Sequence, residues 1–346
     1  MSTTHRSNVR GLTIAALVMT VLVAGSALSA SAQAPRVKIA AAHTGTLFMA
    51  PVYIAEAAGF LAEEGIDFEL TEVDSGALGI AALVAGQVQF FDADPFQAVQ
   101  LRRQGKQILF VYNLTKRVTL DLVMHPEVAR SRNVSRATPL AQRLAALRGL
   151  KLGITRPGAA TDVYMRYYLK RAGLSPDRDV QMLSIGGGAG LLAALRSRQI
   201  DAFHLSAPTP YIAERDGFGV VVIKASAGDV PELDNFLYTG IAVHNVYANR
   251  NGDVLRRWTK AVNRANKLMR QDQAAAINHL RKHFPRTDPV LLTLALREII
   301  PALSEDGTMT EQMLEKHLQF MLDDGQIPFK PSAKEGILWT NRFVVK

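Results

Sequence analysis

The chain has 346 residues, a formal net charge of +9 and no cysteine, and 48% of its residues are hydrophobic. Without cysteine it can hold no disulfide and no lipid attached through a cysteine, so its stability has to come from buried cores. Its 40 Lys and Arg residues are spread without a run of five, which argues against nucleic-acid binding and leaves a mild preference for an anionic ligand.

The first 32 residues have the order of a cleavable secretion signal. Arg6 and Arg10 form a basic start, residues 12–28 are almost uniformly apolar, and small residues follow. Pro35 disfavours a cut after Ala34, so we expect cleavage after Ala32, export to the periplasm and a mature chain of about 314 residues. An uncleaved membrane anchor is the alternative, but the apolar stretch is short for a membrane span.

Strands and helices alternate in the first part of the mature chain. Ile66, Phe68 and Leu70 alternate with polar residues, which indicates a half-exposed strand. Glycines at the expected helix ends act as breakers. The predicted strands are 37–41, 66–73, 88–91 and 108–112, and the predicted helices are 48–58, 77–85 and 95–104.

The same rhythm restarts after a polar loop at 131–138. Strands are expected at 150–155, 180–185, 200–205 and 220–223, with helices at 160–171, 191–198 and 208–216. Such alternation predicts two α/β halves with largely parallel sheets. After Gly252 the pattern is helical nearly to the end, at 254–270, 273–283, 289–303 and 310–322.

Two segments, 75–88 and 188–200, share a local signature. Each has a loop rich in small residues, a helix centred on Ala-Ala-Leu, and a Gln before a strand. A helix N-terminus that no side chain obstructs can hold an anionic or acceptor group. The plainer interpretation is that small residues let the helix pack closely on its sheet. One copy in each half favours two facing lobes that share a ligand.

At this point the sequence resembles a known family, the periplasmic binding proteins of ABC importers for nitrate, sulfonates, taurine and pyrimidine precursors of thiamine. The matching stretches occur in the family's order and cover most of residues 37–250. They are 50–56 (Ala-Pro-Val-Tyr-Ile-Ala-Glu), 59–61, 64–66, 82–88, 147–154, 158–162, and 199–203 followed by Pro208.

The resemblance implies a two-lobed α/β fold of the periplasmic-binding-protein type (type II-like) with two crossovers and a helical C-terminal region. The second lobe would be inserted in the first, with crossovers near 118–124 and 236–243. The expected division is a signal peptide at 1–32, the first part of one lobe at 35–118, the other lobe at 119–237, and a return to the first lobe with C-terminal helices at 238–346.

The resemblance and the ends of the predicted strands together nominate ligand-binding residues. Arg156 could hold a carboxylate or sulfonate bidentately, unless it is merely solvated. Asp94 before Pro95 is first a helix cap, and second a partner for a ligand amine. Phe48, Met49, Phe91 and Phe96 are more typical of core packing. The nominated set is Thr44, Gly45, Phe48, Ser75, Gly76, Asp94, Arg156, Gly158, Ala160, Thr161, Gly187, Gly188 and Ser206.

Enzyme chemistry finds little support in the sequence. Met49 stands where the resembling pyrimidine-precursor synthases carry a histidine, and the cysteine cluster of that branch is missing. His279 and His283 have helical spacing for a metal, but no Glu follows His279, and a solvated helical face explains them. No G-x-S-x-G, P-loop or G-x-G-x-x-G motif occurs. We expect no catalytic residue, metal or cofactor.

The sequence therefore predicts the soluble substrate-binding component of an ABC transporter. It would act as a monomer, capture a small organic solute (an anionic sulfonate or carboxylate) by hinge closure, and deliver it to an inner-membrane permease. A secreted or sensory enzyme on the same fold, acting on a pyrimidine-like molecule, is the alternative. The ligand-sensing half of a regulator is a weaker third hypothesis, because a secretion signal is present and a DNA-binding region is not.

Overall fold

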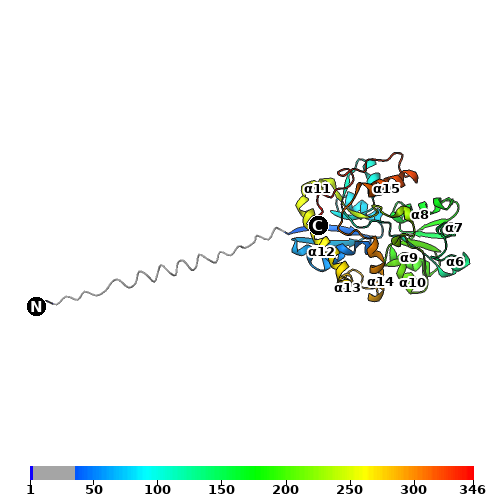
Figure 1. Cartoon of the computed structure of the whole chain (residues 1–346), viewed down its shortest axis with the longest axis horizontal. Coiled ribbons are helices and arrows are strands. Elements are labelled where there is room, and N and C mark those ends of the chain that lie inside the picture. Colours follow the sequence, from blue (N-terminus) through cyan, green and yellow to red (C-terminus); the bar gives the residue numbers. More distant parts are fainter. Residues whose placement is uncertain (3–35) are drawn as a thin grey trace. The chain divides into compact units, whose positions relative to one another are not determined.

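Two five-stranded sheets, each covered by helices, form the part of the chain that the computed structural model describes, residues 1–2 and 36–346 (Figure 1). Residues 37–346 form one compact unit. The expected signal and its cut after Ala32 fall in a stretch that lies outside the described residues, apart from residues 1–2. None of the helices in the described part is both long and apolar enough to cross a membrane.

The first sheet has the strand order β2-β1-β3-β10-β4 and defines lobe I. β1 pairs in parallel with β2 and β3, whereas β10 runs antiparallel to β3 and β4. The carboxyl ends of β1 and β3 therefore lie at the same edge of the sheet. Its strands are β1 Val37–His43, β2 Ile66–Glu72, β3 Phe90–Ala93, β4 Ile108–Asn113 and β10 Gly240–His244.

The second sheet has the order β7-β6-β8-β5-β9 and defines lobe II. β6 pairs in parallel with β7 and β8, and β5 runs antiparallel to β8 and β9. The two sheets thus share one topology, with a single antiparallel strand in the fourth position. The strands are β5 Asp121–Met124, β6 Lys151–Ile154, β7 Gln181–Ser184, β8 Ala202–Leu205 and β9 Val220–Ile223.

The chain crosses between the sheets twice, from β4 to β5 and from β9 to β10. All five strands of lobe II are consecutive in sequence, so lobe II is an insertion between β4 and β10 of lobe I. The predicted two-lobed α/β fold with two crossovers is confirmed. The crossovers expected near 118–124 and 236–243 include β5 and most of β10, which the sequence analysis did not recognise as strands.

The helices follow the predicted alternation closely. α8 and β9 coincide with the predicted 160–171 and 220–223, whereas β3 lies two residues later than expected and α9 begins three residues earlier. The unpredicted short α-helices are α3, α6, α7 and α11. Lobe I carries η1 Leu47–Met49, α2 Ala50–Ala57, α3 Phe60–Glu63, α4 Gly76–Val84 and α5 Pro95–Arg103 before the first crossover. Lobe II carries α6 Pro126–Ser131, α7 Leu140–Ala145, α8 Ala160–Arg171, α9 Gly188–Arg196 and α10 Thr209–Arg215.

The remaining helices are η2 Ala225–Ala227, η3 Pro231–Leu233, α11 Asn245–Arg250, α12 Gly252–Gln271, α13 Gln273–Leu280, α14 Pro289–Ile299, η4 Ile300–Ala302 and α15 Glu311–Asp323. The last helix, α15, agrees with the predicted 310–322, and the chain after Asp323 forms no further helix. α15 reaches lobe II, because Phe320 stacks on Tyr164 of α8 with ring centroids 5.4 Å apart.

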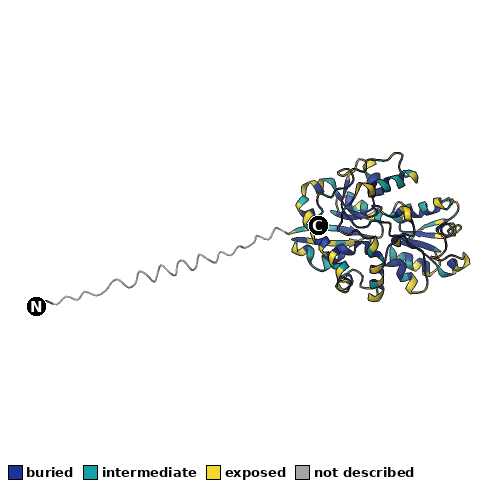
Figure 2. Cartoon of the chain, in the orientation of Figure 1, coloured by how far each residue is buried: buried dark blue, intermediate teal, exposed yellow. Residues whose placement is uncertain are grey.

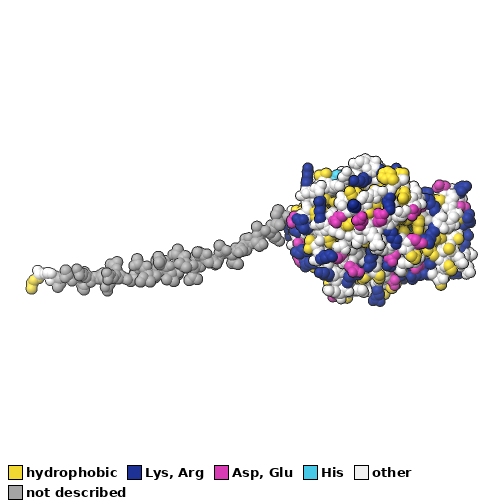
Figure 3. Space-filling model, turned by 45° about the horizontal axis from the view of Figure 1, so that its top comes forward, with side chains coloured by type: hydrophobic (Ala, Val, Ile, Leu, Met, Phe, Trp, Pro, Cys, Tyr) yellow, Lys and Arg dark blue, Asp and Glu magenta, His cyan; other side chains and the backbone are white. Residues whose placement is uncertain are grey.

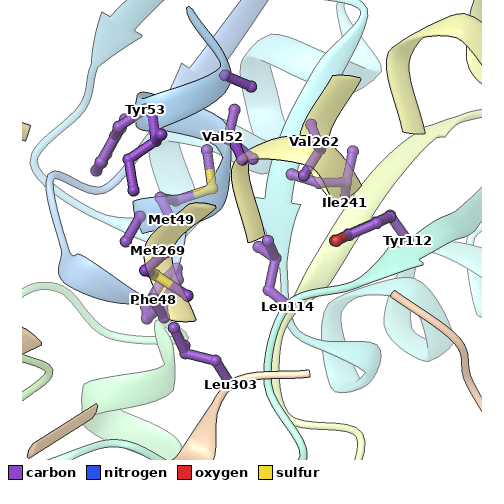
Figure 4. Packing of buried hydrophobic residues seen from close by; sticks show 14 of the residues in the cluster. Phe48, Met49, Val52, Tyr53, Tyr112, Leu114, Ile241, Val262, Met269 and Leu303 are labelled. Atoms are coloured by element: carbon purple, nitrogen blue, oxygen red, sulfur yellow. The ribbon is translucent and has the colours of Figure 1, made fainter. Parts of the chain in front are cut away.

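Each lobe has its own apolar core, with buried strands between helices whose outer faces are exposed (Figure 2). In lobe I, side chains of η1 and α2 converge with Ile241 of β10 and with Val262 and Met269 of α12 (Figure 4). Trp258 of α12 is fully buried and lies 5.3 Å from the ring centroid of Phe90. The apolar cores of both lobes can stabilise the fold of a chain that has no disulfide.

Candidate ligand-binding site

A cavity of about 60 Å³ lies between the two lobes. Because one water needs roughly 10–15 Å³ of such space, it has room for a few waters or one compact chemical group. Residues of both lobes and of both crossovers line it: Thr44, Thr46, Phe48, Asp74, Ser75, Gly76, Asp92, Asp94, Gln97, Leu120, Thr155, Ala159, Ala160, Thr161, Gly187, Gly188, Leu205, Ser206, Tyr238 and Thr239.

The position of the cavity follows from the topology. Its walls are the segments that leave the carboxyl ends of β1, β2 and β3 in lobe I, and of β6, β7 and β8 in lobe II. The N-termini of α4, α5, α8 and α9 begin in these same segments. Open α/β sheets bind ligands at this edge, where loops can change without disturbing the core.

The structure brings ten of the thirteen nominated residues together at the cavity. They are Thr44, Phe48, Ser75, Gly76, Asp94, Ala160, Thr161, Gly187, Gly188 and Ser206. Gly45 is not among the lining residues. Its φ is +69°, and a Cβ there would lie 2.5 Å from Glu72 Oε1, so the glycine serves a close backbone turn.

Arg156 and Gly158 also lie away from the cavity. Arg156 is exposed, and it is the preceding buried Thr155 that lines the wall. Both residues follow the end of β6, and only Thr155 lines the cavity. Gly158 lines a separate cavity of about 650 Å³ between α4 and α5 of lobe I and α8 of lobe II. The guanidinium expected to hold an anion is therefore not part of the interlobe site.

Several lining residues were not nominated from the sequence. Asp92 and Thr46 lie beyond the ends of predicted strands, where an aspartate or threonine after an apolar run could have been noticed. Leu120, Tyr238 and Thr239 come from the crossovers, and local sequence carries no signal that a crossover will form a wall.

The acidic and basic residues in the described lining are all aspartates, namely Asp74, Asp92 and Asp94. By contrast, Lys and Arg are interspersed with Asp and Glu over the face shown in Figure 3. Asp92 is 4% exposed, and burial raises its pKa to about 7 although hydrogen bonds from Thr44 oppose the shift. Its Oδ2 accepts from Thr44 Oγ1 at 2.7 Å and from Thr44 N at 3.3 Å.

Asp94 is already engaged by the protein. It caps α5, where Oδ1 accepts from Phe96 N at 2.9 Å and Gln97 completes a capping box. The structure therefore shows the cap that the sequence suggested. Its Oδ2 accepts from the hydroxyl of Tyr164 in lobe II at 3.0 Å.

A third neighbour of Asp94 fixes its protonation state. His317 of α15 donates from Nδ1 to the carbonyl of Leu237 at 2.8 Å, and its Nε2 lies 3.3 Å from Asp94 Oδ1. Two lone pairs would face each other there unless one group carries a proton. Burial raises the pKa of Asp94 well above its usual range and lowers the pKa of His317 to about 3, so the proton belongs to Asp94.

At two of the helix N-termini at the cavity, the chain itself supplies a capping acceptor. Ser75 Oγ accepts from Leu78 N at the start of α4, and Asp94 caps α5. No side chain in the described part of the chain caps α8 or α9. At α8, Asp162 in the first turn accepts at 2.8 Å from Gly158 N, which precedes the helix. At α9, a Cβ on Gly187 would lie 3.3 Å from Asp74 Oδ1, so an acidic residue of lobe I lies near this lobe II helix. An anionic ligand would therefore meet capping acceptors at α4 and α5 and nearby acidic residues at α8 and α9.

Hydroxyl groups of lobe II form a further polar part of the cavity wall. Thr161 Oγ1 lies 2.8 Å from Thr155 Oγ1 and accepts from Thr155 N at 3.0 Å. Ser206 Oγ lies 2.7 Å from Thr119 Oγ1 of the first crossover. These paired hydroxyls can each turn to donate or accept, so they adapt to a ligand without carrying charge.

The candidates for metal or enzyme chemistry do not form a site. Among the described residues, no group of three or more His, Asp or Glu side chains has an arrangement that could hold a metal. His283 lies beyond α13, half-buried, stacks on Tyr53 with ring centroids 4.6 Å apart, and its Nε2 is 3.0 Å from Glu56 Oε2. It is packed rather than fully solvated, which differs from the sequence interpretation. Met49 is buried in the lobe I core.

Comparison with known proteins agrees with this geometry. A model of the NMT1-like family matches residues 30–280. A Bacillus subtilis (strain 168) protein named as a binding protein, YtlA, is 22% identical over 300 residues, 85% of this chain and 84% of that protein.

Two solved structures show the same fold. One, from Bordetella bronchiseptica RB50, has a TM-score of 0.76 and 23% identity, covering 88% of this chain and 95% of that chain. The other is the alkanesulfonate-binding protein SsuA from Xanthomonas axonopodis pv. citri bound to MOPS. It has a TM-score of 0.69 and 16% identity, covering 87% of this chain and 97% of that one.

Proposed function

The chain belongs to the NMT1-like family, and from this membership and its interlobe cavity we propose that it is the substrate-binding component of an ABC transporter. It captures a small organic solute between its lobes in the periplasm, as a monomer, and delivers it to a permease in the inner membrane. The lobes of the proposal are residues 35–118 with 238–346, and residues 119–237.

The observation that carries this proposal is a small polar cavity whose wall is divided between two separate lobes. Direct contacts hold the lobes together around it: Leu47 N donates to Ala207 O at 2.7 Å, and Tyr164 reaches Asp94 across the gap. A solute enclosed in this way can enter or leave only if the lobes separate at the two crossovers. Hinge closure of this kind is how two-lobed binding proteins commit to a ligand.

Binding without chemical conversion is the role that the lining supports. The sequence favours an anionic sulfonate or carboxylate as the solute, but the carboxylates of the lining argue against that class. Asp94 is occupied by a cap, a tyrosine and a histidine, so it is not a free catalytic acid or base aimed at a bound molecule.

The proposal is tested with a broad solute panel. The purified protein is partly unfolded and refolded to remove carried ligand, and its melting temperature is then measured with amines, amino acids, sulfonates, carboxylates, nitrate and pyrimidines. A ligand at 100 times its Kd should add about 2.7 kcal/mol, which is several degrees. We expect one class to raise the melting temperature, to reduce the radius of gyration by X-ray scattering, and to be recovered unchanged. Steady conversion of the solute, or no response to any class, would overturn the proposal.

Tyr164→Phe is expected to weaken lobe closure. The change removes only the hydroxyl that joins α8 to Asp94, and both groups are buried, so the closed form should lose about 1–2 kcal/mol. The affinity for the stabilising solute should fall about tenfold, because a smaller fraction of the protein is closed. Calorimetric titration and X-ray scattering measure the two effects.

Tyr167→Phe is the matched control on the same helix. Its hydroxyl accepts from Arg171 at the surface rather than bridging the lobes, so affinity and radius should stay unchanged. Equal affinities for wild type and Tyr164→Phe would show that this hydrogen bond does not contribute to closure.

A further inference from the structure

Resting on the proposed function, we propose that the solute binds through a cationic N–H group, an ammonium or amidinium, and that the carboxylate of Asp92 accepts from it. This assignment concerns the chemical class of the ligand. It differs from the anionic class that the sequence favours.

The first argument is an unused acceptor in the cavity wall. Asp92 Oδ2 is taken by Thr44, but Oδ1 has no hydrogen-bond partner among the described residues, although Asp92 is only 4% exposed. Thr46 Oγ1 is in the same situation, and Thr46 is 3% exposed. Both residues line the cavity. A buried acceptor left without a donor costs roughly 1–3 kcal/mol, which a ligand N–H would recover.

The ionisable residues that line the cavity favour a cationic ligand. The described lining contains three aspartates and neither lysine nor arginine, so an anion there would find no counter-charge. Ser75 and Asp94 cap α4 and α5, and no described side chain caps α8 or α9, but the acidic residues Asp162 and Asp74 lie near the starts of these two helices. A compact cation meets the opposite situation, since Asp92 supplies charge and a free lone pair.

The volume of the cavity also favours a small ligand group. A cavity of about 60 Å³ takes a compact group, and ammonium and amidinium groups are compact and carry several N–H donors. Two acceptors, Asp92 Oδ1 and Thr46 Oγ1, suit a group that can donate in more than one direction. The neighbouring hydroxyls of Thr155, Thr161 and Ser206 can accept from the remaining donors.

Three probes of nearly equal shape test the class. Acetamidinium, acetamide and acetate differ mainly in charge and in donors, and are compared by heat of binding and by melting temperature at equal ionic strength. We expect acetamidinium to bind at least about tenfold more tightly than acetate, with acetamide in between. Tighter binding of acetate, or equal binding of acetamide and acetamidinium, would overturn the assignment while leaving the proposed function intact. No response to any of the three would also count against it, and the broad panel described above decides the proposed function separately.

Asp92→Asn identifies the residue. The asparagine oxygen can keep both hydrogen bonds from Thr44 while its NH2 group replaces the free oxygen with a donor, so the variant should fold. We expect it to lose the preference for acetamidinium by about tenfold or more and to gain affinity for acetate. Asp67→Asn, an exposed carboxylate on β2 of the same sheet, is the control and should behave as wild type. An Asp92→Asn protein with the normal melting curve and an unchanged order of affinities would refute the role of Asp92.

Discussion

Gly79→Ala is expected to destabilise the protein by up to about 2 kcal/mol, although alanine is the better helix former. A Cβ at Gly79 would lie 1.9 Å from Phe91 Cε2, and Phe91 is fully buried in β3. Overpacking of a core costs about 1–3 kcal/mol or more, against a gain of about 1 kcal/mol in helix propensity. The midpoint of urea unfolding measures the difference, and Ala81→Ser on the exposed side of α4 should change stability by less than about 0.5 kcal/mol.

A double mutant shows whether the cost comes from this contact. Phe91→Leu replaces the aromatic ring, which the new methyl group would contact, with a smaller side chain. The double mutant Gly79→Ala with Phe91→Leu should therefore lose less stability than the two single changes added together. Neighbouring residues that share a contact usually show such coupling, at about 0.5–3 kcal/mol. Strict additivity would mean that α4 simply moves away from the sheet.

Acetamidinium binding is expected to weaken about tenfold for each pH unit below pH 7 and to be constant above it. The pKa of Asp92 is raised to about 7, and a cation binds only the carboxylate form, so at lower pH the ligand must displace a proton. Acetate should follow the opposite trend, because protonation of Asp92 removes repulsion and supplies a donor. Calorimetric titrations from pH 5 to pH 8 measure both slopes.

Four other titratable groups near Asp92 have shifted pKa values, which bear on titrations between pH 5 and pH 8. Burial lowers the pKa of His43 to about 4, and it raises the pKa values of Asp94, Tyr53 and Tyr238 well above their usual ranges. His43, Tyr53 and Tyr238 are therefore neutral between pH 5 and pH 8, and the raised pKa of Asp94 favours its protonated form. Asp92→Asn should make the acetamidinium profile flat. A slope that persists in this variant would assign the titration to another group, such as Asp121, whose pKa is raised to about 6.

The repeated signature shows what sequence could and could not decide. The packing interpretation is confirmed at one residue, and the ligand-binding interpretation stays a prediction for others. Gly76, Gly187 and Gly188 line the cavity, whereas Gly79 is required by close packing. Aligning the two Ala-Ala-Leu centres sets Leu191 of α9 opposite Gly79.

In lobe II, a glycine on a strand leaves the space that the Leu191 side chain occupies. Gly153 of β6 lies below this helix, and a Cβ on it would be 2.8 Å from Leu191 Cδ2. The glycine that permits close packing between helix and sheet is therefore in the helix in lobe I and in the sheet in lobe II. Only the packed structure shows this exchange, because Gly153 lies outside the aligned segments.

Local periodicity predicted the parallel strands and their helices, and missed the two antiparallel ones. β5 and β10 are buried and short, and neither is followed by the long crossover helix that marks a βαβ unit. Their pairing partners, β8 with β9 and β3 with β4, are distant in sequence. Nothing in a short window distinguishes such a strand from a buried linker.

Ten of the thirteen nominated residues line the candidate cavity, but the sequence did not predict the charge of this lining. Arg156 was nominated for its guanidinium, and Asp92 was not nominated. Which of two neighbouring residues faces inward depends on backbone direction at the end of a strand, and here Thr155 faces the cavity instead of Arg156. This difference is one reason why we propose a cationic ligand.

The insertion of lobe II also sets the order in which the protein can be completed during synthesis. β10 lies between β3 and β4, but it begins 127 residues after β4 ends. At about 5–20 residues per second, β4 waits roughly 6–25 s for the strand that joins it to the rest of its sheet. Lobe II is continuous in sequence and its wait is shorter, because β5 ends 78 residues before its partner β8 begins. We therefore expect lobe II to gain protease resistance first on the ribosome, while lobe I stays open until its last strand is made.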